Sequence, residues 1–173
     1  MPLHGKFVIN DADYAPLTIY GVGVFMAWSG DQHCRNKNGC FDVPDKGPLP
    51  PGKYWIVDRA SGGAGAIAKA LAKDTINGFL GNPSNHWEWF ALYRDDGKID
   101  DFTWINDVRR GQFRLHPAGG RGLSMGCITL LHKSDFQLIR TLLRHTNKVS
   151  VPRAGGLLSY GTIEVIGNGD SCP

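Results

Sequence analysis

The residues best suited to chemistry are a histidine and a cysteine that lie eleven positions apart, His116 and Cys127. The chain between them is rich in glycine and has few bulky apolar side chains, so a loop could bring the imidazole back onto the thiol. A thiol with a pKa of about 8.5 is mostly protonated at neutral pH, and an adjacent imidazole can take up its proton. The backbone N–H groups of Gly126 and Cys127 could stabilise an oxyanion. This window predicts nucleophilic catalysis through a thiolate.

Other interpretations of the same pair stay open. A cysteine before Ile-Thr-Leu-Leu is often only a small buried apolar residue, and a histidine at a strand end is often only a surface residue. The pair could instead serve a cysteine amidase or peptidase of another specificity, which usually adds an Asp or Asn that orients the histidine. The side chains that could do so stand in no motif: Asp100, Asp101, Asn106 and Asp107. A third hypothesis is a non-catalytic module that binds the cell wall, with Cys127 merely buried.

Short strands are expected around the pair. Residues 112–116 predict a strand with Gln112, Arg114 and His116 on its polar face, which places the histidine at a strand end. Residues 87–93 and 99–105 predict the two strands of a hairpin. Further strands are expected at residues 17–28, as one bent strand or a hairpin, and at residues 53–58 and 162–166.

Helices are expected in only two places. Residues 134–145 carry apolar side chains at helical spacing, and Ser134 with Gln137 has the pattern of a capping box. The alanine-rich residues 64–73 predict a second, short helix. Gly and Pro together make 33 of the 173 residues (23 and 10), which favours turns between short strands. We therefore predict a mainly β fold with one or two short helices, as a single domain over residues 1–173.

The composition excludes several classes of protein. With 42% hydrophobic residues, the chain can build a core and is not disordered as a whole. Nineteen Lys and Arg against 16 Asp and Glu give a net charge of +3, too weak to indicate a nucleic-acid partner. No stretch reaches the roughly 18 apolar residues that a membrane-spanning helix needs. Because nothing indicates a coiled coil or an exposed apolar helix face, we expect a monomer.

The four cysteines and the N-terminus bear on the compartment. A disulfide between Cys34 and Cys40, across a polar loop, would suit an oxidising compartment, and two free thiols are an equal alternative. Cys172 is next to last and is expected to be frayed. His33 beside Cys34 matches no common zinc spacing, so we expect no metal. The N-terminus has no apolar stretch of signal-peptide length, so the chain is cytosolic, has lost a leader, or is exported by another route.

Residues 124–128, Ser-Met-Gly-Cys-Ile, together with the preceding His116, resemble the active-site signature of the L,D-transpeptidase (YkuD-like) superfamily. In that superfamily a His precedes a Ser/Thr-His-Gly-Cys-Ile/Val-Arg motif. Residues 45–54 resemble its Thr-Pro-x-Gly-x-Phe/Tyr hairpin entry. The resemblance covers residues 45–58 and 112–131 directly and implies a YkuD-like β-sandwich or barrel that acts on peptidoglycan without a cofactor.

Two departures point to one branch of that superfamily. Met125 stands where a His is usual, and Thr129 stands where an Arg is usual. With residues 21–30 and 57–63, these make the chain resemble the type VI secretion L,D-transpeptidase effectors of Gram-negative bacteria. That branch implies an antibacterial toxin without a conventional signal peptide, made in the cytoplasm and delivered to the periplasm of a rival. The implied partners are type VI secretion components and a cognate immunity protein.

The resemblance also implies roles for residues. Cys127 would attack the carbonyl that precedes the terminal D-alanine of a peptidoglycan tetrapeptide stem. His116 would activate the thiol and then protonate the departing amine, while the backbone N–H groups of Gly126 and Cys127 hold the oxyanion. If the acyl group passes to water, the enzyme acts as an L,D-carboxypeptidase. If it passes to the amine of another stem, a crosslink forms, and if it passes to a free D-amino acid, the terminal residue is exchanged. The resemblance to the toxin-like branch favours water and the free D-amino acid as acceptors of the acyl group.

Several nearby side chains are candidates for binding the substrate. Ser124 could position the loop or a substrate carbonyl, with a simple turn hydroxyl as the alternative. Arg114 and Arg121 could each hold a stem carboxylate through two hydrogen bonds, with a solvated guanidinium as the alternative. Trp87 and Trp89 could line a groove for the glycopeptide, although a Trp on an alternating strand is more often in the core.

Overall fold

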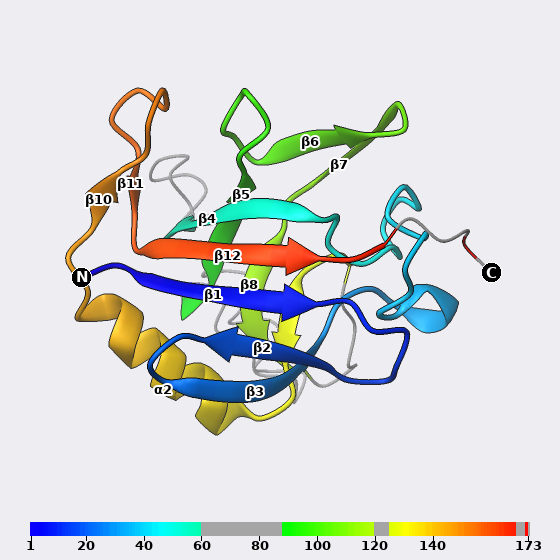
Figure 1. Ribbon diagram of the computed structural model, residues 1–173, viewed down its shortest axis with the longest axis horizontal. Coiled ribbons are helices and arrows are strands. Elements are labelled where there is room, and N and C mark those ends of the chain that lie inside the picture. The colour runs from blue at the N-terminus through cyan, green and yellow to red at the C-terminus, as the bar shows by residue number, and fades with distance from the viewer. Residues whose placement is uncertain (60–87, 120–124, 169–171, 173) are drawn as a thin grey trace, which may run out of the picture.

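Eight strands of the computed structural model close into a barrel (Figure 1). The structure describes residues 1–59, 88–119, 125–168 and 172. The barrel order is β1-β12-β4-β5-β8-β9-β3-β2. Its strands are β1 (Leu3–Val8), β2 (Ala15–Ile19), β3 (Gly23–Trp28), β4 (Gly52–Asp58), β5 (Phe90–Arg94), β8 (Arg114–Pro117), β9 (Ile128–Leu130) and β12 (Gly161–Ile166). The mainly β prediction is therefore confirmed.

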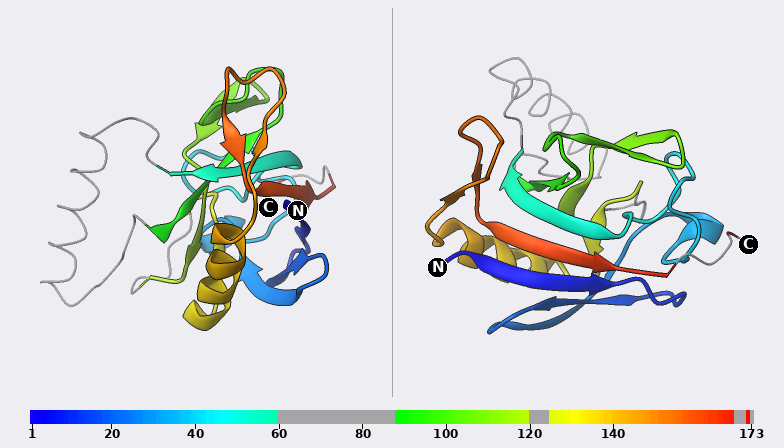
Figure 2. Two further views of the ribbon diagram at one scale, coloured as in Figure 1. Left: turned by 90° about the vertical axis from the view of Figure 1, so that its left-hand side faces the viewer. Right: turned by 45° about the horizontal axis from the view of Figure 1, so that its top comes forward.

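Two small hairpins, one helix and one 3-10 turn complete the described fold. The hairpins are β6 (Phe102–Ile105) with β7 (Val108–Gly111), and β10 (Val149–Ser150) with β11 (Leu158–Ser159). Both hairpins project from the same side of the barrel (Figures 1 and 2). The 3-10 turn is η1 (Gln32–Cys34), and the helix is α2 (Lys133–Arg144). None of the helices in the described ranges is long and apolar enough to cross a membrane.

Apolar side chains that alternate along the strands fill the barrel. Phe7, Leu17, Ile56 and Ile163 come from four different strands, and each is at most 1% exposed. Each such side chain contributes about 1.5–3 kcal/mol by leaving water. The strands predicted at residues 53–58 and 162–166 are confirmed by β4 and β12.

The strands that carry the histidine and the cysteine region pair in parallel. β8 and β9 align Leu115 with Ile128 and His116 with Thr129. Helix α2 packs against both strands and buries Phe136, Ile139 and Leu143 (Figure 1). The helix therefore supports the pair of strands from which the candidate site is built.

The helix itself begins differently from the sequence-based expectation. The apolar spacing over residues 134–145 correctly predicts α2. The predicted capping box is wrong, because His132 is the N-cap without a side-chain bond and Ser134 lies inside the first turn. The Gln137 amide donates instead to Glu88 at 3.2 Å. The predicted helix at residues 64–73 lies outside the described residues.

One predicted hairpin is confirmed and another is wrong. Residues 17–28 contain the antiparallel pair β2–β3. Residues 99–105, by contrast, do not pair with the strand before them, since β6 pairs with β7 and β5 pairs with β4 and β8. Asn106 and Asp107 both adopt positive φ, 47° and 64°, in the two-residue loop between β6 and β7. Asn and Asp tolerate this conformation better than other non-glycine residues, and it matches the twist of a tight hairpin.

The strand at residues 112–116 is shorter than predicted. Gln112 has a φ of 57°, which breaks the extended backbone, and β8 begins at Arg114. Only Arg114 and His116 therefore share a strand face, and Gln112 does not. The strand predicted at residues 87–93 begins at Phe90, and Trp87 lies outside the described residues.

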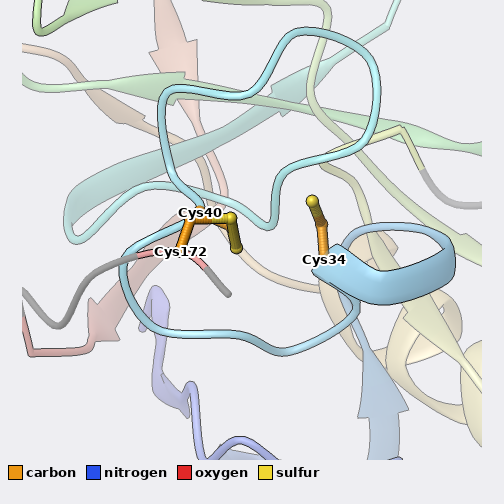
Figure 3. A group of neighbouring side chains, drawn as sticks. All are labelled: Cys34, Cys40 and Cys172. Carbon is orange, nitrogen blue, oxygen red and sulfur yellow. A yellow bond between two sulfur atoms is a disulfide. The ribbon is translucent and has the colours of Figure 1, made fainter.

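The disulfide joins a different pair of cysteines from the predicted one. Cys40 bonds to Cys172 with a Cα–Cα distance of 4.6 Å, whereas Cys34 is free and buried (Figure 3). Beyond β12, the backbone N–H of Asn168 donates to the Asn38 side chain at 2.9 Å, which brings the C-terminal segment beside the Cys40 loop. Of the two alternatives that the sequence left open, the Cys34–Cys40 bond is wrong and only Cys34 is a free thiol, while Cys172 is anchored rather than frayed.

Candidate active site

Cys127 lies immediately before β9, at the bottom of a buried site. The residue is 8% exposed, and its thiol lies 3.9 Å from the Gln112 carbonyl oxygen, to which it donates. The backbone N–H of Arg114 donates to the sulfur from the neighbouring strand. Gly126 precedes the cysteine with a φ of 95°, a conformation that favours glycine. The thiol is therefore fixed between two backbone groups at a sharp turn.

His116 is held so that one ring nitrogen is a hydrogen-bond acceptor. Its Nδ1 lies 2.8 Å from the Pro117 carbonyl oxygen, which can only accept, so Nδ1 carries the proton. In the neutral ring, Nε2 is then the basic nitrogen. The Thr129 hydroxyl lies 3.4 Å from Nε2 and can donate to it. The backbone carbonyl of Pro117 thus orients the imidazole, the role for which the sequence offered only unplaced Asp and Asn residues.

The strand register brings His116 close to the segment that carries the thiol. His116 pairs with Thr129, and Cys127 lies two residues before Thr129 along the chain, in the bend that leads into β9. The Trp89 ring stacks on the His116 ring at 4.3 Å between centroids. This stacking restricts the imidazole to one plane, and only 6% of His116 remains exposed.

Burial keeps the Cys127 thiol neutral in the free protein. Burial raises the pKa of Cys127 to about 11 from an ordinary 9.0. The backbone N–H of Arg114 and the cations of Arg114 and Arg110 act in the opposite direction but do not cancel the effect of burial. Deprotonation of this thiol therefore needs a base next to it.

Arg114 is already engaged by a carboxylate of the protein. Its Nη1 and Nη2 donate to the two oxygens of Asp101 at 2.7 and 2.9 Å. Burial alone would lower the pKa of Arg114, but the bonds to Asp101 raise it. A substrate carboxylate at Arg114 would have to compete with Asp101.

A second cation, Arg110 of β7, lies beneath the turn that carries the cysteine. Arg110 is 4% exposed, and its guanidinium donates to the backbone carbonyls of Phe41, Gly47 and Pro48 at 2.7–2.9 Å. A Cβ at Gly126 would lie 2.5 Å from Arg110 Nη2, so only glycine leaves room for the guanidinium. Sequence analysis missed Arg110, because adjacent arginines on a short strand carry no signal that one of them is buried.

Two polar hollows adjoin the site. One has a volume of about 190 Å³ and is lined by Asp45, Phe102, Arg109, Arg110, Gln112 and Met125, among others. The other has a volume of about 180 Å³ and is lined by residues that include Arg59, Trp89, Arg140 and Arg144. Neither Cys127 nor His116 lines either of these two hollows, but Met125, two positions before Cys127, lines the first, and Trp89, which stacks on His116, lines the second.

The remaining predicted residues fall outside this site or outside the description. Ser124 and Arg121 lie outside the described residues. Thr129, at the position where the family usually has Arg, is fully buried with its hydroxyl towards His116.

Among the described residues, one group could hold a metal ion, Cys34, Cys40 and Cys172, whose sulfur atoms lie within 4.8 Å of one another (Figure 3). Because two of these sulfurs form the disulfide, the group offers one free thiol.

Comparison with known proteins adds a family to this geometry. A comparison with curated proteins gave no match. The family model of the Tlde1 domain matches residues 23–154, a range that runs from β3 to beyond β10 and includes His116 and Cys127. The chain therefore belongs to the Tlde1 domain family, a family of type VI secretion effector domains.

Proposed function

We propose that this protein is a cysteine enzyme of the L,D-transpeptidase (YkuD-like) superfamily that cleaves or exchanges the terminal D-alanine of peptidoglycan tetrapeptide stems. The observation that carries the proposal is the hydrogen bond from His116 Nδ1 to Pro117 O, which leaves Nε2 basic on a strand that pairs with β9, the strand directly after Cys127. Membership of the Tlde1 domain family supports the part of the proposal that makes this protein a type VI secretion effector.

The reaction follows from the chemistry of these groups. As the Cys127 sulfur attacks the carbonyl before the terminal D-alanine, His116 Nε2 takes the thiol proton. The backbone N–H groups of Gly126 and Cys127 stabilise the oxyanion. His116 then gives its proton to the departing D-alanine amine, and a thioester remains on Cys127. Water hydrolyses this thioester, or the amine of a free D-amino acid or of another stem replaces the sulfur.

A buried neutral thiol suits this order of events. Because burial raises the pKa of Cys127 to about 11, the thiolate forms only when the proton has somewhere to go. Substrate that fills the site supplies the electrophile at the moment of proton transfer, so the charged sulfur need not persist in the buried site. Stems that lose or exchange D-alanine no longer serve as donors for crosslinking, and this loss of donors would make the protein toxic.

This activity would be exerted in the periplasm of a target bacterium. We propose that type VI secretion components deliver the protein there and that a cognate immunity protein protects the producing cell. The monomer, without metal or organic cofactor, would be the active form, because acyl transfer through a thiolate needs neither.

The proposal is tested with purified disaccharide-tetrapeptide and mass spectrometry. Wild-type protein, Cys127→Ala and Cys34→Ala are each incubated with the stem, with and without a free D-amino acid. Cys34 is the other buried free thiol, so its replacement is the matched control. We expect loss or exchange of D-alanine with the wild type and Cys34→Ala and none with Cys127→Ala. Turnover by Cys127→Ala, or unchanged stems with the wild type, would contradict the proposal.

A further inference from the structure

We propose that the hollow beside Cys127 is a subsite for an amino-acid zwitterion, in which Arg109 binds the carboxylate and Asp45 binds the ammonium group. This inference rests on the proposed function and adds the ligand chemistry of the neighbouring hollow. The hollow has a volume of about 190 Å³. Drug-sized ligands usually occupy about 300–1,000 Å³, so this one suits a small charged group rather than a whole stem.

The two charges in the hollow lie at the surface, although Asp45 also interacts electrostatically with the buried Arg110. Arg109 and Asp45 are both exposed. In the described part of the chain, the ion pairs join neither of them to another side chain. Arg110 lines the same hollow but already donates to three backbone carbonyls, which leaves Arg109 as the cation that can bind a carboxylate.

The Arg109 guanidinium is also positioned in advance. It lies over the Phe102 ring at 4.2 Å, across the β6–β7 hairpin. Stacking on an aromatic ring limits the rotation of the planar guanidinium and leaves its edge open for a carboxylate with two hydrogen bonds. Less conformational entropy is then lost when the carboxylate binds.

The hollow also lies next to the nucleophile. Gln112 lines it, and the Gln112 carbonyl accepts the Cys127 thiol at 3.9 Å. Met125, another lining residue, is two positions before Cys127. A zwitterion held there would therefore lie beside the acyl group on Cys127.

Two sources could supply this chemistry during the reaction. One is a free D-amino acid, which replaces the sulfur in the exchange reaction. The other is the amino-acid end of a diamino acid side chain in the donor stem. Both present an ammonium group and a carboxylate on one carbon, and the kinetic part of the test distinguishes them.

Direct binding tests the subsite without turnover. D-alanine is titrated into Cys127→Ala protein and followed by NMR, beside N-acetyl-D-alanine, which lacks the ammonium group, and D-alanine amide, which lacks the carboxylate. We expect saturable binding of D-alanine that weakens about tenfold or more for either derivative and in Arg109→Gln or Asp45→Asn. Matched controls remove exposed charges elsewhere, in Arg153→Gln and Asp13→Asn. Diaminopimelate is titrated in the same way. The proposal would be overturned by equal binding of D-alanine and its two derivatives, by binding of neither D-alanine nor diaminopimelate, or by equal losses in the control variants.

Kinetics then identify the source and separate the two proposals. If the subsite holds the free D-amino acid, Arg109→Gln raises the KM for the D-amino acid in the exchange reaction tenfold or more. If it holds the stem, the same variant raises the KM of a diaminopimelate stem but not that of a lysine stem. If the wild type is active and the KM values of Arg109→Gln and Asp45→Asn are unchanged, the subsite alone is refuted. If the wild type is inactive but still binds D-alanine, only the proposed reaction is refuted.

Discussion

The reactivity of Cys127 should depend steeply on pH. Burial raises the pKa of this thiol to about 11 from an ordinary 9.0. At pH 7 the thiolate fraction is then about 10⁻⁴, against about 10⁻² for a thiol of pKa 9.0, since each pKa unit is a factor of ten. Iodoacetamide reacts with the thiolate, so alkylation at pH 7 should be at least a hundredfold slower than at an ordinary thiol. The 8% exposure of Cys127 slows it further.

The assay follows intact mass after iodoacetamide treatment between pH 7 and pH 10. The Cys34→Ala variant is used, because Cys40 and Cys172 are joined and Cys127 is then the one free thiol. The alkylation rate should rise about tenfold per pH unit over the whole range, without a plateau. An unfolded sample of the same variant gives the rate of the exposed thiol.

A rate that levels off at or below pH 7 would refute this reasoning. It would mean that a thiolate–imidazolium pair with His116 already exists in the free protein. Neutral Cys127 in the free protein would instead mean that the proton moves during the attack on the substrate. The pH profile therefore decides when His116 acts.

The other predictions concern the turn, the disulfide and one acidic network. Gly126→Ala should abolish turnover and lower the free energy of unfolding by about 1–3 kcal/mol more than Gly97→Ala. Both glycines have the same positive φ, 95° and 96°, but only at Gly126 would the new Cβ meet Arg110 and Phe113. Cys172→Ser should lower the free energy of unfolding by up to about 5 kcal/mol in denaturant titrations, because the disulfide spans 132 positions; a stability equal to the wild type would count against it. Burial would raise the pKa of Asp58, but the bonds from Lys148 and Tyr160 outweigh it and lower the pKa below 3.8. This stabilisation is present above pH 3.8 and is lost as the pH falls through the lowered pKa. The Tm difference between wild type and Asp58→Asn should therefore shrink in acid, and a constant difference would contradict the assignment.

The sequence made the local features of the fold predictable. The apolar run within residues 53–58 and the alternation of apolar residues within 162–166 mark two barrel strands, because side chains on a strand point alternately inwards and outwards and β4 is buried on both faces. The 3.6-residue spacing in residues 134–145 marks α2 in the same way. The first strand, β1, was not recognised, because its polar His4 and Lys6 alternate with a glycine and its partners are β2 and the distant β12.

The sequence did not predict how some of the strands and the cysteines pair with one another. β6 pairs with β7 rather than with the strand before it, because the loop at Asn106 and Asp107 can take positive φ. Cys40 bonds to Cys172 rather than to nearby Cys34, because β12 carries the C-terminal segment to the Cys40 loop. Both outcomes depend on which segments meet in the folded barrel.

The sequence by itself marked Cys127, His116 and Gly126 as one candidate chemical window, because a thiol, an imidazole and a glycine-rich loop lie close together in the chain. Only the tertiary structure decided what surrounds them. It provided the Pro117 carbonyl that orients His116, the buried Arg110 beneath Gly126 and the hollow that Arg109 and Asp45 share. Reactive side chains can be recognised from their residue type. Their orientation, their burial and the charges around them depend on contacts between segments that lie far apart in the chain.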